Sequence, residues 1–252
     1  MSLASRSVLG MRVDATTYTD VVEDAIGWAL ARTSSYVCVA NVHMVMEAFD
    51  SGAFRRVVNG ANIVTPDGRP LMWALRWLGV DRATQVRGTD LLSHVVERAV
   101  REGVPVGLYG GTEESLDGLV RALEERYPGF RVACRISPPF RELTAEEDDG
   151  YVREICASGV GILLVGLGCP KQEVWMAEHV GRVPAVMIGV GAAFDFFSGR
   201  AGQAPRWMQS AGLEWAYRLF KEPRRLWRRY LKHNPRFAAM FAAQYAGLKD
   251  YE

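Results

Sequence analysis

The stretch Gly161-Ile-Leu-Leu-Val-Gly-Leu-Gly-Cys-Pro-Lys-Gln-Glu-Val-Trp175 decides the fold, because it joins a buried strand to a helix through a glycine turn. Its apolar run is hydrophobic on both faces, which is typical of a central strand in a parallel sheet. Gly166 and Gly168 allow a tight turn beside a ligand, and Pro170 suits the first turn of the helix that follows. The free N–H groups of such a helix start predict an anion site, although glycines that serve only chain reversal explain the pattern equally well.

A second glycine turn follows at once along the chain. The apolar run Ala185-Val-Met-Ile-Gly-Val-Gly191 ends in Gly189 and Gly191, ahead of Ala192-Ala-Phe-Asp-Phe-Phe-Ser-Gly199. Neighbouring strands of an open parallel sheet that end in glycine turns mark a ligand crevice at the carboxyl edge of the sheet. We therefore expect the two turns to face each other across one anionic ligand.

Strand and helix patterns alternate along the rest of the chain. Because parallel strands need crossover helices, this alternation predicts an α/β fold with a doubly wound, mostly parallel sheet of the Rossmann-like kind. The predicted strands span residues 7–13, 36–40, 62–65, 105–109, 130–134, 161–165 and 184–188. The predicted helices span residues 18–31, 42–59, 69–78, 89–102, 113–127, 145–158 and 171–179.

The composition indicates a soluble enzyme of one main domain. Of the 252 residues, 49% are hydrophobic and 23% are charged, and both values are ordinary for globular proteins. No apolar run reaches the roughly 18 to 20 residues of a membrane-spanning helix, and the N-terminus lacks the apolar core of a signal peptide. The four cysteines form no Cys-x-x-Cys pair and no Cys/His cluster suited to zinc, which predicts reduced thiols in a cytoplasmic protein.

The C-terminal segment is basic and aromatic. Residues 206–236 carry nine Lys or Arg and two Glu, a net charge of +7 in a chain whose total is +1. Trp and Tyr interleaved with cations are typical of a helix at an anionic membrane surface, where each cation contributes about 1 kcal/mol. A solvated helical face packed on the core is the alternative, and the acidic remainder of the chain argues against nucleic acid.

This change of character divides the chain into two parts. We predict an α/β catalytic core over residues 1–205 and a basic, aromatic, membrane-targeting helical appendage over residues 206–252. Pro223 interrupts helical hydrogen bonding, so the appendage is expected to form two helices with a bend.

A carboxylate follows another predicted strand, in Asn62-Ile-Val-Thr-Pro-Asp-Gly-Arg-Pro70. Asp67 would then lie at the carboxyl edge of the sheet, near the glycine turns, where it could act as a general base. An Asx turn or a helix N-cap explains the same residue without chemistry. Asn41 follows the strand 36–40 and has the same two explanations.

These motifs, in this order, resemble the bacterial WecG/TagA/CpsF family of glycosyltransferases, glycosyltransferase family 26, over nearly the whole chain. The resemblance is carried by Ala40-Asn41 with Met44-Val-Met-Glu-Ala48, Thr65-Pro-Asp-Gly68, Gly88-Thr-Asp-Leu91, Tyr109-Gly-Gly111, Gly166-Leu-Gly-Cys-Pro-Lys-Gln-Glu173, Gly189-Val-Gly-Ala-Ala-Phe-Asp195 and Glu222-Pro-Arg-Arg-Leu226.

The resemblance implies an inverting, metal-independent transfer of a sugar from a UDP-sugar to a polyprenyl-diphosphate-linked sugar. Typical members transfer N-acetylmannosamine to N-acetylglucosaminyl-diphosphoundecaprenol in teichoic acid synthesis, in the cell-wall and surface-polysaccharide context. Others use N-acetylmannosaminuronic acid, or transfer glucose in exopolysaccharide synthesis. The expected location is cytoplasmic, peripherally associated with the inner face of the cell membrane, and the oligomeric state stays open, a homo-oligomer included.

The resemblance also implies residue roles. Asp67 becomes the catalytic base, Lys171 supplies charge and Gln172 hydrogen bonds to the donor diphosphate, while Glu173 either binds or caps its helix. The appendage supplies arginines whose planar donors suit diphosphate oxygens. The expected substrate-binding residues are Asn41, Arg87, Gly110, Gly166, Gly168, Lys171, Gln172, Gly189, Gly191, Asp195, Arg218, Arg225 and Arg228.

Two positions depart from the family pattern. Val39 stands where many relatives have Thr, and Gln85-Val-Arg-Gly88 stands where they have Arg-Val-x-Gly. Arg87 replaces the lost guanidinium from two residues on only if the segment is extended. A member with altered sugar selectivity is the expected consequence.

No metal and no cofactor are expected in the chemistry. The chain contains no Asp-x-Asp, the usual carboxylate pair that holds a metal on a sugar diphosphate. Cations and helix N-termini are then left to stabilise the leaving diphosphate. A nicotinamide-dependent oxidoreductase lacks support because no Gly-x-Gly-x-x-Gly lies near the N-terminus, and a non-catalytic protein that binds nucleotide-sugar and membrane is the remaining alternative.

Overall fold

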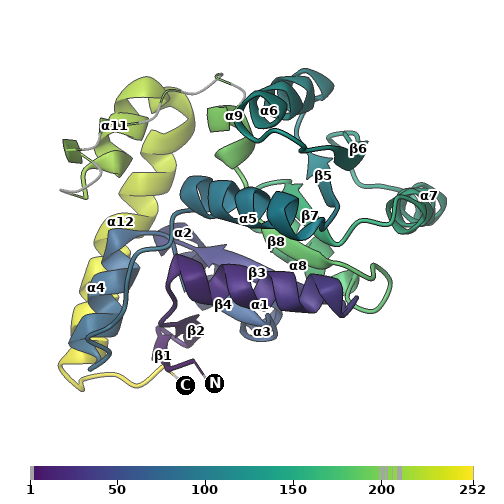
Figure 1. The fold of residues 1–252 in the computed structure, drawn as a ribbon. Coiled ribbons are helices and arrows are strands. Elements are labelled where there is room, and N and C mark those ends of the chain that lie inside the picture. The colour runs from purple at the N-terminus through teal and green to yellow at the C-terminus, as the bar shows by residue number, and fades with distance from the viewer. Residues whose placement is uncertain are drawn as a thin grey trace.

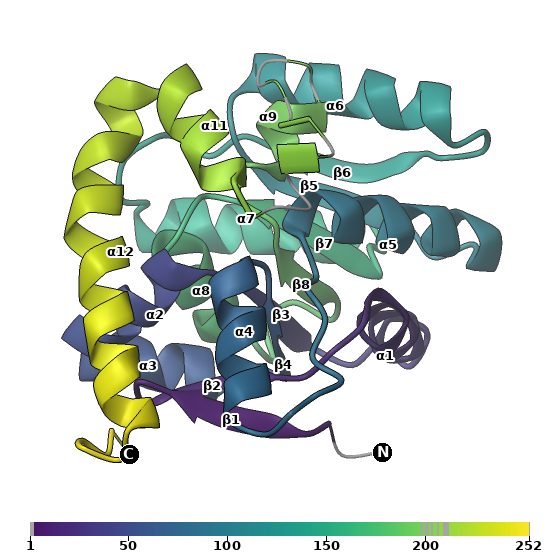
Figure 2. The same ribbon diagram turned by 90° about the vertical axis from the view of Figure 1, so that its left-hand side faces the viewer.

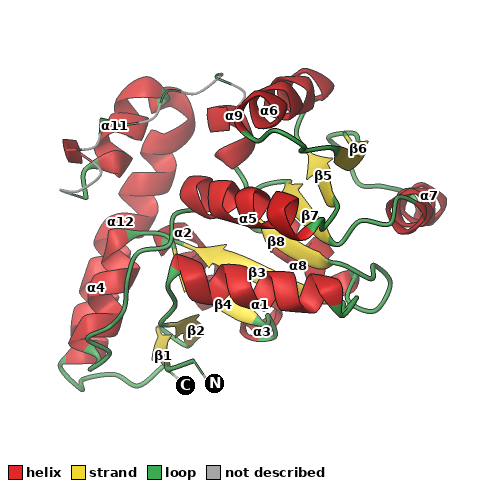
Figure 3. Ribbon diagram, viewed as in Figure 1, coloured by secondary structure: helices red, strands yellow, loops and turns green. Residues whose placement is uncertain are grey.

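The protein is described by a computed structural model, which covers residues 3–197, 199, 202, 204–205, 207–208 and 212–251. Six parallel strands form the central sheet in the order β4-β3-β8-β7-β5-β6 (Figure 3). They are β3 (Ser35–Ala40), β4 (Ile63–Pro66), β5 (Val106–Gly110), β6 (Val132–Ile136), β7 (Ile162–Gly166) and β8 (Val186–Gly189). The predicted parallel sheet is confirmed, and the two strands with glycine turns, β7 and β8, are neighbours at its centre.

Helices cover both faces of the sheet, as the doubly wound prediction requires (Figure 1). One face packs against α1 (Tyr18–Leu30), α5 (Gly88–Glu102), α6 (Glu113–Arg126) and α9 (Ala193–Phe197). The other packs against α2 (Val42–Asp50), α3 (Gly52–Asn59), α7 (Ala145–Ala157) and α8 (Lys171–Glu178). Side chains alternate across each strand, so that Val37 and Val39 enter one core while Cys38 and Ala40 enter the other.

Two predicted elements are wrong in detail. The single strand expected at residues 7–13 is a hairpin of β1 (Ser5–Val8) and β2 (Met11–Asp14), which pair antiparallel apart from the main sheet. Leu9 and Gly10 both have positive φ, 54° and 85°, and this reverses the chain. The single helix expected at residues 42–59 is broken into α2 and α3, because Ser51 is extended and its hydroxyl accepts a hydrogen bond from the Phe54 N–H.

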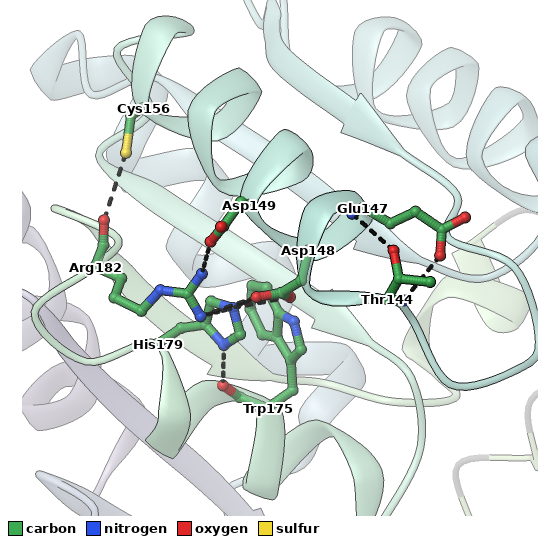
Figure 4. Close-up of polar contacts among 8 residues, drawn as sticks. All are labelled: Thr144, Glu147, Asp148, Asp149, Cys156, Trp175, His179 and Arg182. Carbon is green, nitrogen blue, oxygen red and sulfur yellow. Dashed lines mark hydrogen bonds and ion pairs between the residues drawn. The ribbon is translucent and has the colours of Figure 1, made fainter.

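A polar cluster fastens α7 to the segment that follows α8 (Figure 4). The Asp148 carboxylate lies 3.1 Å from His179 Nε2 and 2.8 Å from Arg182 Nη1, while His179 Nδ1 lies 2.6 Å from the Trp175 carbonyl. The Trp175 and His179 rings stack at 4.0 Å. These contacts hold α8, and with it the glycine turn at its start, against the body of the protein.

The C-terminal segment forms two helices, α11 (Glu214–Lys221) and α12 (Pro223–Tyr245), and the predicted bend at Pro223 is confirmed. In Figure 2, α12 runs along α2 and α4 (Arg69–Trp77). Phe237 and Phe241 are buried in the same core as α2. The Arg236 guanidinium donates two hydrogen bonds to the Asp50 carboxylate, at 2.7 and 2.5 Å. The inner face of α12 therefore belongs to the main core, and the division between residues 205 and 206 stays a proposal.

Candidate active site

The carboxyl ends of five strands open onto a cavity of about 540 Å³, which we call the donor cavity after the ligand that the sequence leads us to expect there. Gly166 and Gly168 after β7 line one wall, and Gly189 and Gly191 after β8 line another. The two predicted glycine turns thus face one cavity, whose volume is in the range of ordinary small-molecule sites. Both turns arrive there because β7 and β8 are parallel neighbours and end at the same edge of the sheet.

Close packing requires glycine at positions 166 and 189. A Cβ at Gly166 would come within 2.6 Å of the Phe194 ring, and a Cβ at Gly189 would come within 3.0 Å of Gln172 Nε2. Gly110 has a φ of +111° and packs its backbone against Gly166, so it supports the wall from behind, while its neighbour Gly111 lines the cavity.

The start of α8 presents a fixed amide to the cavity. Gln172 is buried and lines the cavity, its Oε1 accepts a hydrogen bond from the Gly168 N–H at 3.1 Å, and its Nε2 donates to Glu173 Oε1 at 2.8 Å. Glu173 is fully buried, and burial raises the pKa of its carboxyl group. Glu173 thus orients the Gln172 amide rather than facing the ligand. Lys171 is exposed and does not line the cavity.

Asp67 lies half-buried at the end of β4. Its N–H donates to the Ala40 carbonyl at 2.8 Å, and its Oδ1 accepts from the Gly88 N–H at 3.2 Å. Burial, together with the nearby Glu214 carboxylate, raises the pKa of this carboxyl group to about 7, whereas Arg218 opposes the shift. A carboxylate that titrates near neutral pH, held by the backbone at the rim of a cavity, is suited to take a proton from a hydroxyl.

Gln85 and Arg87, from the segment that departs from the family pattern, both lie near Asp67. Gln85 Nε2 donates to the Asp67 carbonyl at 2.5 Å, and Arg87 lines the donor cavity. Arg87 also pairs with Asp90 and, through Nε at 3.3 Å, with Glu214 of α11. Arg87 therefore links the body of the protein to the C-terminal helices beside Asp67.

Asn41 and Asp195 also line the donor cavity. Asn41 caps α2, since its Oδ1 accepts from the N–H groups of His43 and Met44 at 3.1 and 3.3 Å. The capping explanation is thus confirmed, and it fixes the side chain at the cavity wall. Asp195 on α9 accepts a hydrogen bond from Ser115 Oγ at 3.4 Å.

The C-terminal helices complete the cavity with residues that the sequence did not single out. Glu214, Arg229 and Tyr230 line it together with the expected Arg218. Arg228 is instead exposed, with its guanidinium 5.3 Å from the Trp227 ring, and the side chain of Arg225 lies outside the described part of the structure. The inward position of Arg229 could have been inferred from the sequence. It lies next to the stripe that forms the buried face of α12, which consists of Leu226, His233, Phe237 and Phe241.

A second cavity of about 730 Å³ adjoins the first, and we call it the apolar groove. It runs between α4 and α12 and is lined by aromatic side chains, with the Trp77 ring 5.9 Å from Phe241 and 6.3 Å from Tyr245. The two cavities share a wall made of Asn41, Asp67, Glu214, Arg218, Arg229 and Tyr230. Asp67 therefore stands where a polar cavity meets an apolar one.

The outer surface of α11 and α12 is apolar and basic at once. Phe220, Trp227 and Leu231 are at least 46% exposed, and Trp215, which also lines the apolar groove, is 45% exposed. Cationic side chains lie between them in the sequence. Large exposed apolar side chains next to cations are typical of a helix that lies on a membrane surface. Within the described ranges, no helix has both the length and the apolar character that crossing a membrane requires.

Comparison with known proteins gives two findings. A family model described as "Glycosyl transferase WecG/TagA/CpsF family" matches residues 6–251, which include the sheet and the C-terminal helices. A curated protein of Bacillus spizizenii, N-acetylglucosaminyldiphosphoundecaprenol N-acetyl-beta-D-mannosaminyltransferase, is 27% identical over 225 residues, covering 86% of this chain and 82% of its own length.

Proposed function

The chain belongs to the WecG/TagA/CpsF family of glycosyl transferases, and from this premise we propose that it transfers N-acetylmannosamine from a UDP-sugar to N-acetylglucosamine on a polyprenyl diphosphate. The reaction forms a disaccharide lipid for cell-wall polymer synthesis. The name of the Bacillus spizizenii relative supports this choice of acceptor and sugar, and the two adjoining cavities offer separate places for a polar donor and a lipid-linked acceptor.

We assign the donor to the donor cavity. The glycine turns let the backbone approach the diphosphate, and the fixed Gln172 amide offers a donor beside them. Arg218 and Arg229 approach from the C-terminal helices and neutralise charge on the leaving UDP. With cations in this place, the transfer step needs no divalent metal.

We assign the acceptor to the apolar groove. Its aromatic lining suits a polyprenyl chain, and its polar end at Asp67 suits the sugar hydroxyl that attacks. Attack from the groove on a donor held in the adjoining cavity is a single displacement, which inverts the anomeric centre. The acceptor oxygen forms the new glycosidic bond, its proton passes to Asp67, and the bond to UDP breaks.

We propose that the outer surface of α11 and α12 brings the groove to the lipid. Exposed aromatic side chains enter the headgroup region, and lysines and arginines attract an anionic leaflet. We therefore propose peripheral association with the cytoplasmic face of the membrane, with α11 and α12 as the targeting appendage.

One observation carries the proposal: Asp67, with its pKa raised to about 7, lies on the wall that the two cavities share. The test is release of UDP from a panel of UDP-sugars with a short-chain prenyl-diphosphate N-acetylglucosamine acceptor. Turnover with UDP-N-acetylmannosamine, lost in Asp67→Asn, supports the assignment. UDP-glucose belongs in the panel because Val39 lines the donor cavity where many relatives have a hydroxyl, and a preference for it would reassign the donor.

A further inference from the structure

Three potential metal ligands meet where α12 packs on α2. His43 and Glu47 lie one turn apart on α2, and His233 comes from α12. Glu47 Oε1 lies 3.7 Å from His43 Nδ1 and 3.7 Å from His233 Nε2, and one ligand atom of each residue lies within 4.8 Å of the others. No local sequence pattern marks this cluster, because His233 is far from His43 and Glu47 in the chain.

At the observed distances, Glu47 Oε1 forms no hydrogen bond with His43 Nδ1 or with His233 Nε2. A separation of 3.7 Å is too long for a hydrogen bond, and His43 Nδ1 is buried without any hydrogen-bond partner. His233 is only 4% exposed, and its Nδ1 also lacks a partner. Buried polar atoms normally find partners, so the unpartnered His43 Nδ1, which faces the Glu47 carboxylate, calls for a ligand that accepts its lone pair.

We propose that His43, Glu47 and His233 bind a divalent transition-metal ion of the Zn²⁺ kind, which fastens α12 to α2. Two imidazoles and one carboxylate are a zinc-type donor set, and tetrahedral zinc holds such ligand atoms about 3.3 Å apart. The two 3.7 Å separations to Glu47 need a small contraction, and the third separation, between the two imidazoles, lies within 4.8 Å. Mg²⁺ is disfavoured because it prefers oxygen ligands.

The cluster offers an oriented imidazole and an entry path, and the positive charges of Arg229 and Lys232 lie near both histidines. A hydrogen bond with the Cys169 backbone acts on the His43 ring, which is how proteins orient metal-binding imidazoles. Both histidines line the apolar groove, which gives an ion its entry path and leaves room for a water ligand.

A bound ion would hold α12 in its packed position against α2. His233 lies one helical turn after Arg229, so an ion that ties His233 to α2 also fixes Arg229 at the donor cavity. The Arg236–Asp50 pair and buried Phe237 hold α12 without the ion. Glycosyl transfer is therefore expected to continue in a chelator, and the inference does not depend on the proposed function.

The test uses the tag-free full-length chain, freed of metal with EDTA and then titrated with Zn²⁺ and separately with Co²⁺. We expect one ion per chain, and a Co²⁺ visible spectrum without the intense thiolate band that binding at the cysteines would give. At a Zn²⁺ concentration of about 100 times Kd, the midpoint of thermal unfolding should rise by about 5 to 10 °C. Mg²⁺ should produce neither effect.

The variants are His43→Ala, Glu47→Gln and His233→Ala, each checked for folding by circular dichroism, with exposed His94→Ala as the matched control. Each ligand variant should weaken Zn²⁺ binding at least about tenfold, while His94→Ala binds like the parent. Glu47 is partly exposed, so Glu47→Gln keeps the test available if a buried histidine variant fails to fold. The proposal is overturned if the parent chain takes up no stoichiometric Zn²⁺, or if Glu47→Gln binds it unchanged.

Discussion

Replacing Asp67 by Asn should remove catalysis and at the same time stabilise the protein at alkaline pH. Asn keeps an oxygen for the hydrogen bond from the Gly88 N–H but can neither ionise nor accept a proton. The loss of a general base commonly lowers turnover by ~10²–10⁴-fold. UDP binding should stay within a few fold of the parent, because we assign Asp67 to the attacking hydroxyl and not to the diphosphate.

The stability gain follows from the pKa of this carboxyl group, which burial raises from 3.8 to about 7. The folded state then binds the Asp67 proton more tightly than the unfolded state does. The free energy of unfolding therefore falls as pH rises through this window, by at most about 1.4 kcal/mol per unit and about 4 kcal/mol in all. The Asn variant has no such proton to lose, so its advantage should be about 2 to 3 kcal/mol larger at pH 8 than at pH 5.

Urea unfolding of both proteins at pH 5 and pH 8 measures this difference, with Asp81→Asn as the control at an exposed carboxylate. The kcat/KM of the parent enzyme should rise with pH to a plateau, with an apparent pKa near 7, since only the ionised base accepts the proton. Equal stability differences at the two pH values would refute the buried-carboxylate argument, and near-normal turnover of the Asn variant would refute the catalytic role.

Three further predictions follow from the site. Arg218→Ala and Arg229→Ala should each lower turnover by about 10- to 100-fold, because each removes a cation that we assign to the leaving diphosphate; Arg228→Ala should change turnover less than twofold, and steady-state UDP release distinguishes them. Turnover should persist in EDTA and should not rise on addition of Mg²⁺ or Mn²⁺, and a loss that these ions reverse would contradict metal-independent transfer. Trp77→Ala should raise KM for a long-chain polyprenyl acceptor more than for a short-chain one, because Trp77 lines only the apolar groove; equal effects on both acceptors would remove the lipid from that groove.

Local patterns in the sequence were sufficient to predict the parallel sheet, the two glycine turns and the position of Asp67. Apolar runs that end in glycine predict β7 and β8 and their turns, because strand alternation and backbone freedom are properties of a few consecutive residues. Asp67 was placed at the same edge for the same reason, since it directly follows β4. The hairpin of β1 and β2 was missed because Leu9 gives no sign in the sequence that it adopts positive φ.

Tertiary packing alone decided which side chains of α11 and α12 enter the site. Which arginine of α12 enters the cavity depends on the rotation of that helix, and this is set by Phe237 in the core and by the pair of Arg236 with Asp50, residues 186 positions apart. The same packing brings Glu214 close to Asp67 and raises the pKa of the Asp67 carboxyl group. Such contacts join distant segments, and no pattern within one segment encodes them. The sequence therefore determined the chemistry available at the sheet edge, and the packing of the C-terminal helices determined which charges complete it.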